Sequence, residues 1–298
     1  MKPRGFQIGT FGLDALGLLI NVRSAVDQGA SLIRYQMMHP DAPGWTAQQY
    51  QAWWRDQLDL IRDMIYEMRD RGIFAHIVVD CHTGPGPAES SHSCITNTYW
   101  RAIWRENWLA AVEHLKDLDE IWGYDLLNEP LCRNQRKWLQ FAGDLAKQIR
   151  QQDRRTRIII ESRKGAPGAF RAMRPINVPK VWYSAHIYKP RKLCFYGIFD
   201  NITADQARRA ARNLTIEKAE TILEPVRTFQ RRYKVPIYIG EIGCSIRTHP
   251  DDRDHFFRQF LSLFNRYRWA WSVHAWRESW EFDYESYGGL IPIMDKIK

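Results

Sequence analysis

Short apolar runs alternate with longer stretches of helical period along almost the whole chain, and this alternation limits the folds open to it. Eight runs rich in β-branched and other apolar residues are expected to be strands, at residues 6–10, 31–36, 74–80, 121–127, 157–161, 181–186, 237–240 and 269–275. Stretches with helical spacing lie between them, among them residues 48–71, 99–115, 136–151, 216–232 and 252–267. Strands that alternate with helices in this way indicate repeated βα units on a parallel sheet.

The length of one repeat favours a closed barrel. Eight units in 298 residues correspond to about 37 residues each, the spacing of a (β/α)8 TIM barrel. A doubly wound open sheet is the main alternative, but it usually carries a glycine-rich phosphate turn after its first strand. Residues 9–12, Gly-Thr-Phe-Gly, are too sparse for that turn, and no linker divides the chain. We therefore predict an α/β fold with a single TIM barrel over residues 1–298, in which residues 284–298 leave little room for an eighth helix.

Composition excludes several other classes of protein. Apolar residues make up 45% and charged residues 26%, which is ordinary globular usage rather than that of a disordered or fibrous chain. No apolar run approaches the roughly 20 residues that span a bilayer, so no membrane partner is expected. Residues 1–10 do not have the pattern of a signal peptide. We expect a monomer that is secreted or periplasmic, with its signal outside this sequence, although a cytoplasmic location stays open.

The net charge is positive but scattered. Lys and Arg number 43 and Asp and Glu 34, which leaves a formal charge of +9. The basic pairs at residues 154–155, 208–209 and 231–232 lie on or near expected helices. A nucleic-acid site would gather such charge on one face together with exposed aromatic rings. We interpret these arginines as a solvated surface and expect no nucleic-acid partner.

Polar and ionisable side chains follow most of the expected strands. In a TIM barrel the reactive groups lie where the strands end, at the C-terminal mouth. The residues at these ends are Arg34, His82, Asn128, Glu129, His186, Tyr188, Glu241 and Trp276. A barrel built for stability alone has no reason to place such groups at nearly every strand end, so together they predict an active site.

Two of these residues, Glu129 and Glu241, form the most informative pair. They are separated by about three repeats, which places them at the ends of the fourth and seventh strands, across one mouth. Hydrolysis of a glycosidic bond needs two carboxyl groups, one as acid and the other as nucleophile or base. Either glutamate alone would more readily be a solvated loop residue, but the pair favours a glycosidase.

Four segments around these residues resemble, in chain order, the motifs of glycoside hydrolase family 5. Residues 123–130, Gly-Tyr-Asp-Leu-Leu-Asn-Glu-Pro, are similar to its Asn-Glu-Pro signature, and residues 80–86 to its strand-three histidine segment. Residues 185–188, Ala-His-Ile-Tyr, resemble its His-x-Tyr on strand six, and residues 239–243, Ile-Gly-Glu-Ile-Gly, its nucleophile strand. The resemblance to these retaining, cellulase-like enzymes runs from about residue 5 to residue 276.

The resemblance implies that Glu129 is the acid/base and Glu241 the nucleophile. The acid must keep its proton near neutrality while the nucleophile stays ionised, so the two need different surroundings.

The other residues at the strand ends are expected to bind substrate or tune the glutamates: Arg34, His82, Asn128, His186, Tyr188 and Trp276. Arg34 and Tyr188 would donate hydrogen bonds to Glu241, and Asn128 would bind the sugar 2-OH. Trp276 would offer a flat face to the sugar ring, with Trp271 and Trp280 as alternatives for that role.

The cysteines give a less definite signal. They are Cys81, Cys94, Cys132, Cys194 and Cys244, an odd number without C-x-x-C spacing. Zinc could be proposed for Cys81, His82, His92 and Cys94, but neighbouring strand residues point to opposite faces. We expect no metal and no cofactor, and favour a Cys81–Cys94 disulfide over a zinc site. Ser162 lacks a G-x-S-x-G context, which disfavours a serine hydrolase.

The sequence thus predicts a retaining glycoside hydrolase that cleaves a β-linked glucan or a related polysaccharide or oligosaccharide, as an endo-β-glucanase does. Retaining enzymes hold their carboxyl groups about 5–5.5 Å apart and inverting enzymes about 6.5–9.5 Å, so we expect the short separation. The glycan, and endo or exo action, stay open. A catalytically inactive barrel that only binds carbohydrate and a basic nucleic-acid-binding protein are the alternatives.

Overall fold

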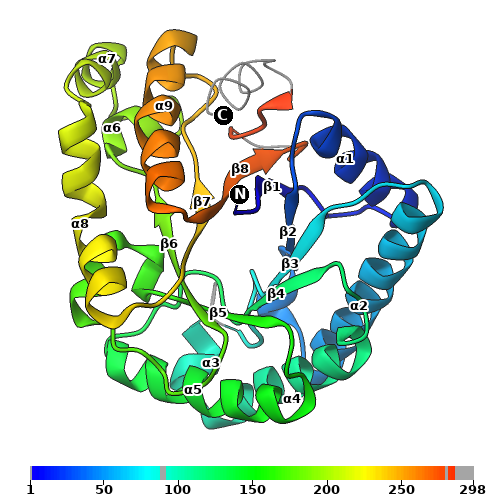
Figure 1. Cartoon of the computed structure of the whole chain (residues 1–298). Helices are drawn as coiled ribbons and strands as arrows, with labels where there is room; N and C mark the ends of the chain where they lie inside the picture. Colours follow the sequence, from blue (N-terminus) through cyan, green and yellow to red (C-terminus); the bar gives the residue numbers. More distant parts are fainter. Residues whose placement is uncertain (1, 88–91, 279–280, 286–298) are drawn as a thin grey trace.

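The computed structural model describes residues 2–87, 92–278 and 281–285, and its eight parallel strands form a closed barrel. Figure 1 shows the first strand beside the last, where the barrel closes. The strands are β1 (Arg4–Ile8), β2 (Leu32–Gln36), β3 (His76–Asp80), β4 (Ile121–Asp125), β5 (Arg157–Glu161), β6 (Val181–Ile187), β7 (Ile237–Ile242) and β8 (Ala270–Trp276). All eight predicted strands are present within two residues of their expected bounds, and the predicted TIM barrel is confirmed.

Helices surround this barrel (Figure 1). The α-helices are α1 (Ala15–Asp27), α2 (Ala47–Asp70), α3 (His92–Thr96), α4 (Thr98–Leu115), α5 (Gln135–Gln152), α6 (Arg191–Cys194), α7 (Ala204–Arg212), α8 (Ile216–Tyr233) and α9 (Pro250–Tyr267). Short 3-10 helices are η1 (Ala42–Gly44), η2 (Arg163–Gly165) and η3 (Pro167–Ala172). The five expected helices are α2, α4, α5, α8 and α9. Within the described residues, no helix combines the length and the apolar character needed to cross a bilayer. The expectation about an eighth helix concerns residues that lie mostly outside the described part of the chain.

The barrel interior changes from apolar to charged along the strands. The part nearest the N-terminal ends of the strands is an apolar cluster separate from the main core. It is made of Leu32, Val78, Trp122, Ile159, Trp182, Tyr238 and Ala270. Side chains two positions apart on a strand share a face, so Arg34 follows Leu32, Asp80 follows Val78, and Glu161 follows Ile159 into the same interior. All three charged residues are fully buried. The strand period therefore sets a charged layer directly beneath the mouth.

Tryptophans on the surrounding helices hold the strand ends. Trp104 and Trp108 of α4 are buried, and both indole N–H groups donate to the carbonyl oxygen of Leu126, at 2.9 Å each. Trp138 of α5 donates in the same way to the carbonyl oxygen of Glu161, at 2.9 Å. These two tryptophans, four residues apart on α4, are thus packing residues, and they fix the segment that leads to Glu129.

All five cysteines are buried thiols. The Cys81–Cys94 disulfide that was favoured over a zinc site is therefore not formed. Cys81 instead packs beside the hydroxyl of Tyr50, 3.9 Å from its Sγ, and the carbonyl oxygen of Thr83, 3.8 Å away.

Candidate active site

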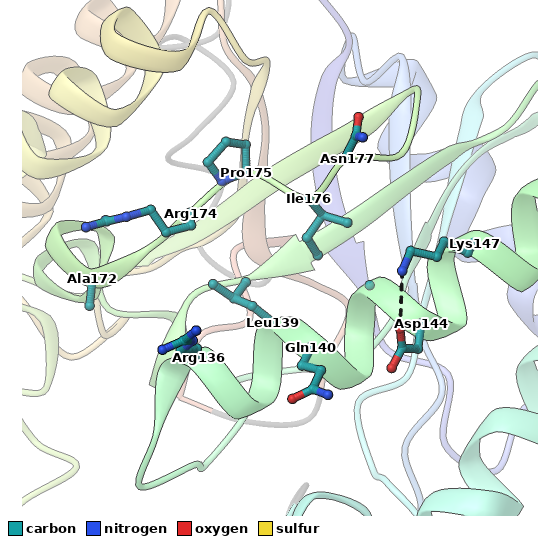
Figure 2. Close-up of a pocket in the computed structure, with 11 residues that line it drawn as sticks. Arg136, Leu139, Gln140, Asp144, Lys147, Ala172, Arg174, Pro175, Ile176 and Asn177 are labelled. Carbon is teal, nitrogen blue, oxygen red and sulfur yellow. Dashed lines mark hydrogen bonds and ion pairs between the residues drawn. The ribbon is translucent and has the colours of Figure 1, made fainter.

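A cavity of about 630 Å³ opens at the C-terminal ends of the strands. Residues at or after the ends of β1, β2, β3 and β8 line it, including Phe11, Gln36, His82, His274, Arg277 and Glu278. A larger cavity, of about 890 Å³, is lined by residues of α5 and of the segment that begins at the end of η3; Figure 2 shows these residues. That second cavity contains none of the predicted site residues, and its Lys147 is paired with Asp144 at 3.4 Å.

Glu241 reaches the mouth through an irregularity in β7. Ala185 pairs with Ile239 but His186 pairs with Glu241, so β7 carries one extra residue opposite β6. The residue at this bulge, Gly240, lies so close to β6 that a Cβ there would be 2.7 Å from Oγ of Ser184. Glycine is therefore required, and the bulge redirects the Glu241 side chain into the barrel interior.

Donors surround the buried carboxylate of Glu241. Arg34 donates to its Oε1 at 2.5 Å and Tyr188 to its Oε2 at 2.6 Å. His186 Nδ1 lies 3.4 Å and His274 Nδ1 3.7 Å from Oε2. Burial opposes ionisation, but His186, Arg34 and His274 outweigh it and hold the pKa of Glu241 well below its ordinary value of 4.5. Glu241 is thus an anion at neutral pH, as a nucleophile must be.

Glu129 lies in a different environment. Its side chain is 41% exposed, and Oε1 lies 3.0 Å from Nδ1 of His186. Its backbone has a φ of 41°, in the left-handed region that non-glycine residues rarely adopt. The N–H of Glu129 donates to Oε2 of Glu161 at 2.7 Å, which helps to hold this conformation. One carboxylate therefore faces open space while its partner is buried among donors.

The two glutamates lie close together. One carboxylate oxygen of Glu129, one of Glu241 and one ring nitrogen of His186 all lie within 4.8 Å of one another. This is close to the separation of about 5–5.5 Å expected for retaining enzymes and below the range of about 6.5–9.5 Å for inverting ones.

Arg34 organises the charged layer beneath the pair. Its guanidinium lies within hydrogen-bonding or ion-pair distance of four carboxyl groups: Asp80 (3.0 Å), Asp125 (3.3 Å), Glu161 (3.0 Å) and Glu241 (2.5 Å). Burial and the neighbouring Glu161 raise the pKa of Asp125 well above its ordinary value of 3.8, although Arg34 lowers it. Arg34 was expected to donate to Glu241, and the structure places it in that position.

Tyr188 links Glu241 to a charged pair at the end of β8. Its hydroxyl lies 2.5 Å from Nδ1 of His274, whose Nε2 lies 2.8 Å from Oε2 of Glu278. Burial lowers the pKa of His274, but Glu278 and Glu241 raise it more, to a value above 6.5. A protonated His274 donates to both neighbours and leaves the Tyr188 proton for Glu241.

His82 and Asn128 form the side of the mouth next to β3. His82 Nδ1 lies 3.0 Å from Oδ2 of Asp80, and its Nε2 lies 3.4 Å from Nδ2 of Asn128. The side-chain oxygen of Asn128 accepts a hydrogen bond from Arg34 at 3.1 Å. Both side chains are partly exposed, so both have atoms that a sugar hydroxyl can reach.

Trp276 does not lie at the mouth. It is only 2% exposed, its ring packs 4.8 Å from that of Phe6, and its indole N–H donates to Ser24 of α1. The register between β1 and β8 shifts between Phe6 and Ile8, and this shift directs Trp276 outward. Trp271 is also buried, and Trp280 lies outside the described residues.

Three residues of the site were not predicted from the sequence: Glu161, His274 and Phe11. Glu161 ends an expected strand and shares the face of Ile159, so the period of two could have indicated it. His274 lies four positions after Ala270 on the interior face of β8, so the same period could have indicated it. Phe11 is 56% exposed and lines the cavity. Among the described lining residues, it has the aromatic side chain on which a sugar ring could stack.

Two groups of side chains have the donors that a metal ion would need: Glu129, His186 and Glu241, and Asp80, Asp125 and Glu161. In the second group the guanidinium of Arg34 already lies among the carboxyl groups. In the first, both oxygens of Glu241 already accept hydrogen bonds, from Arg34 and Tyr188. Within the described residues neither group contains Cys81 or Cys94 of the zinc hypothesis, and we assign neither as a metal site.

A sequence model of "Cellulase (glycosyl hydrolase family 5)" matches residues 21–279. A search of curated protein sequences finds no match.

Among solved structures, the cellulose synthase subunit Z of Clostridioides difficile superposes with a TM-score of 0.73 at 13% identity, over 95% of this chain and 94% of that one. The endoglucanase Cel5A of Pseudomonas stutzeri gives 0.69 at 18% identity, over 94% and 89%. Cel5A of Thermotoga maritima gives 0.69 at 16% identity, over 94% and 91%. At these identities the superpositions establish the shared fold.

Proposed function

The chain belongs to glycosyl hydrolase family 5 and is a glycoside hydrolase, and on this premise we propose that it is a retaining enzyme in which Glu241 is the nucleophile and Glu129 the acid/base. The observation that carries the proposal is the close approach of two carboxylates in unlike surroundings. Their oxygens lie within 4.8 Å, one carboxylate is buried among cations, and the other is 41% exposed. Such a difference in environment is what separates an acid from a nucleophile.

In the first step Glu241 attacks the anomeric carbon. The C–O bond to the leaving sugar breaks as an ester bond from Glu241 forms, and Glu129 transfers its proton to the departing oxygen. Arg34 and Tyr188 hold the attacking carboxylate in one orientation through its two oxygens. The positive charge that develops on the sugar lies beside the ionised carboxylate of Glu241.

In the second step Glu129 acts as the base. It removes a proton from a water molecule, the hydroxide equivalent attacks the anomeric carbon, and Glu241 leaves as a carboxylate. The exposure of the Glu129 side chain gives water access to it. Two inversions at the same carbon give overall retention of configuration.

We propose β-linked glucan as the substrate class. Structural relatives are described as endoglucanases, and one is described as a complex of Thermotoga maritima Cel5A with mannotriose. The cavity beside the glutamates presents His82, His274, Arg277 and Glu278 to sugar hydroxyls and Phe11 to the apolar face of a ring. Mannan is therefore the first competitor to test.

Release of reducing sugar from a panel of β-glucan, mannan and xyloglucan tests the activity and ranks the substrates. Proton NMR of the first product tests the stereochemistry, and we expect the β-anomer from a β-linked substrate. Initial formation of the α-anomer would contradict a retaining mechanism. Binding of glycan without hydrolysis would instead identify an inactive, carbohydrate-binding barrel.

A further inference from the structure

A third carboxylate, Glu161 at the end of β5, contacts Arg34 and His186, the two residues that in turn contact the catalytic glutamates. It is fully buried. Its Oε1 lies 3.0 Å from the guanidinium of Arg34 and 2.9 Å from Nε2 of His186. Its Oε2 accepts the backbone N–H of Glu129 at 2.7 Å. Glu161 faces away from solvent and cannot touch substrate, so any effect on catalysis passes through these three neighbours.

His186 is held between glycine backbones and carboxylates. A Cβ on Gly165, which has a φ of +60°, would lie 2.8 Å from Cγ and Nδ1 of the ring, and one on Gly240 would lie 2.9 Å from Nε2. Nε2 lies within ion-pair distance of Glu161, at 2.9 Å, and Nδ1 lies within hydrogen-bonding distance of Glu129, at 3.0 Å. The two glycines leave the ring little room to turn, and a ring with hydrogen on both nitrogens, which is the charged form, suits both carboxylates.

The charges that face His186 are mostly negative. The facing groups are Glu161 from β5, Glu129 after β4, Glu241 from β7 and Asp125 of β4, with Arg34 of β2 on the same oxygen of Glu161. Burial lowers the pKa of His186, but Glu161 and then Glu241 raise it more, to well above its ordinary value of 6.5. Glu161 is the largest of these favourable contributions, and unlike Glu241 it forms no bond in the proposed reaction.

We infer that Glu161 is a positioning residue that keeps His186 charged, so that the Nδ1–H group of His186 serves whichever of Glu129 and Glu241 is ionised. Nδ1 lies 3.0 Å from Oε1 of Glu129 and 3.4 Å from Oε2 of Glu241, within reach of both. The catalytic part of this inference rests on the proposed function. In the first step Glu129 holds the proton and Glu241 is the anion. In the glycosyl-enzyme Glu241 is an ester and Glu129 is the anion, so one imidazolium stabilises both states in turn.

The test compares Glu161→Gln with the wild type by NMR of 15N-labelled histidine. We expect His186 to stay protonated from pH 5 to 8 in the wild type and to titrate within that range in Glu161→Gln. The alkaline limb of the pH profile of kcat should move to lower pH in the variant, while KM changes little. One pH unit above the lowered pKa, about tenfold less enzyme carries the charged ring, so kcat should fall about tenfold. Glu161→Asp, which keeps the charge, should restore much of the wild-type profile.

Glu120→Gln is the matched control, because Glu120 is also a buried carboxylate paired with an arginine, Arg69, but at the start of β4. It should lower stability without moving the pH profile. A His186 that titrates near its ordinary value in the wild type would overturn the inference even if Glu161→Gln did not fold. An unshifted His186 titration in Glu161→Gln would overturn it as well. If the wild type hydrolyses no glycan, the proposed function fails, while the two titrations still decide the role of Glu161.

Discussion

The hydroxyl of Tyr188 lies 2.6 Å from Oε2 of Glu241, and the same hydroxyl lies 2.5 Å from Nδ1 of His274. Because the hydroxyl donates its proton to Glu241, its oxygen is left to accept a hydrogen bond from Nδ1–H of His274. The carboxylate is thus held by a neutral donor on one oxygen and by Arg34 on the other. This arrangement orients Glu241 towards the mouth without neutralising it.

Removal of this hydroxyl in Tyr188→Phe should lower kcat about 10–100-fold, since a hydrogen bond to a charged group contributes about 1.5–3 kcal/mol. KM should change less, because the tyrosine orients the nucleophile. Steady-state kinetics on an aryl glycoside measure both. Tyr99→Phe is the control, as that ring is 58% exposed. Equal loss in both variants would contradict the role of Tyr188.

Glu241→Ala should abolish turnover of every substrate, because no covalent intermediate can form without the carboxylate. Azide or formate can occupy the space left and attack in its place, which would restore a slow reaction with inverted configuration. Product analysis by NMR identifies the azide adduct. Rescue of Glu129→Ala with inversion, and none of Glu241→Ala, would reverse the two assignments.

Glu129→Ala should retain the first step on an aryl glycoside with a good leaving group, because such a group departs without a proton. Hydrolysis of the glycosyl-enzyme then slows for lack of a base. Stopped-flow absorbance should show a burst of phenol followed by slow turnover, with activity on polysaccharide lost. A variant that lacks the burst and keeps wild-type polysaccharide activity would exclude Glu129 as acid/base.

Trp276 and Phe11 should respond differently to truncation. Trp276→Ala removes a buried ring and should lower the free energy of unfolding by about 3–5 kcal/mol. Phe11→Ala, at a side chain that is 56% exposed, should raise KM severalfold with little effect on stability. Urea unfolding and KM for an oligosaccharide separate the two effects. A raised KM and unchanged stability for Trp276→Ala would restore Trp276 as the sugar-binding ring.

Much of the barrel could be predicted because each strand is marked by the residues within its own short segment. Runs such as Ile158 to Ile160 are apolar on both faces, and that pattern arises only where helices cover one side and the barrel interior the other. Polar residues at successive strand ends were then placed together by the topology alone, which brought Arg34, Tyr188 and Glu241 within hydrogen-bonding distance.

The remainder depended on register and on long-range packing. Trp276 was expected at the mouth because it ends a strand, but one extra residue in β8 relative to β1 turns it outward. A Cys81–Cys94 disulfide was favoured over a zinc site, but the sulfur of Cys81 packs against Tyr50 of α2. No pattern within one strand carries this information, since each outcome is set by a neighbouring element.

The identity of the nucleophile is tested most directly by trapping the covalent intermediate. A 2-deoxy-2-fluoro aryl glycoside of the preferred sugar slows both steps, and a good leaving group lets the first proceed, so the glycosyl-enzyme accumulates. Mass spectrometry of a proteolytic digest then locates the sugar. The mechanism predicts one fluorosugar per chain, on Glu241, and none in Glu241→Ala. A sugar attached to Glu129, or turnover with inverted configuration and no trapped intermediate, would contradict it.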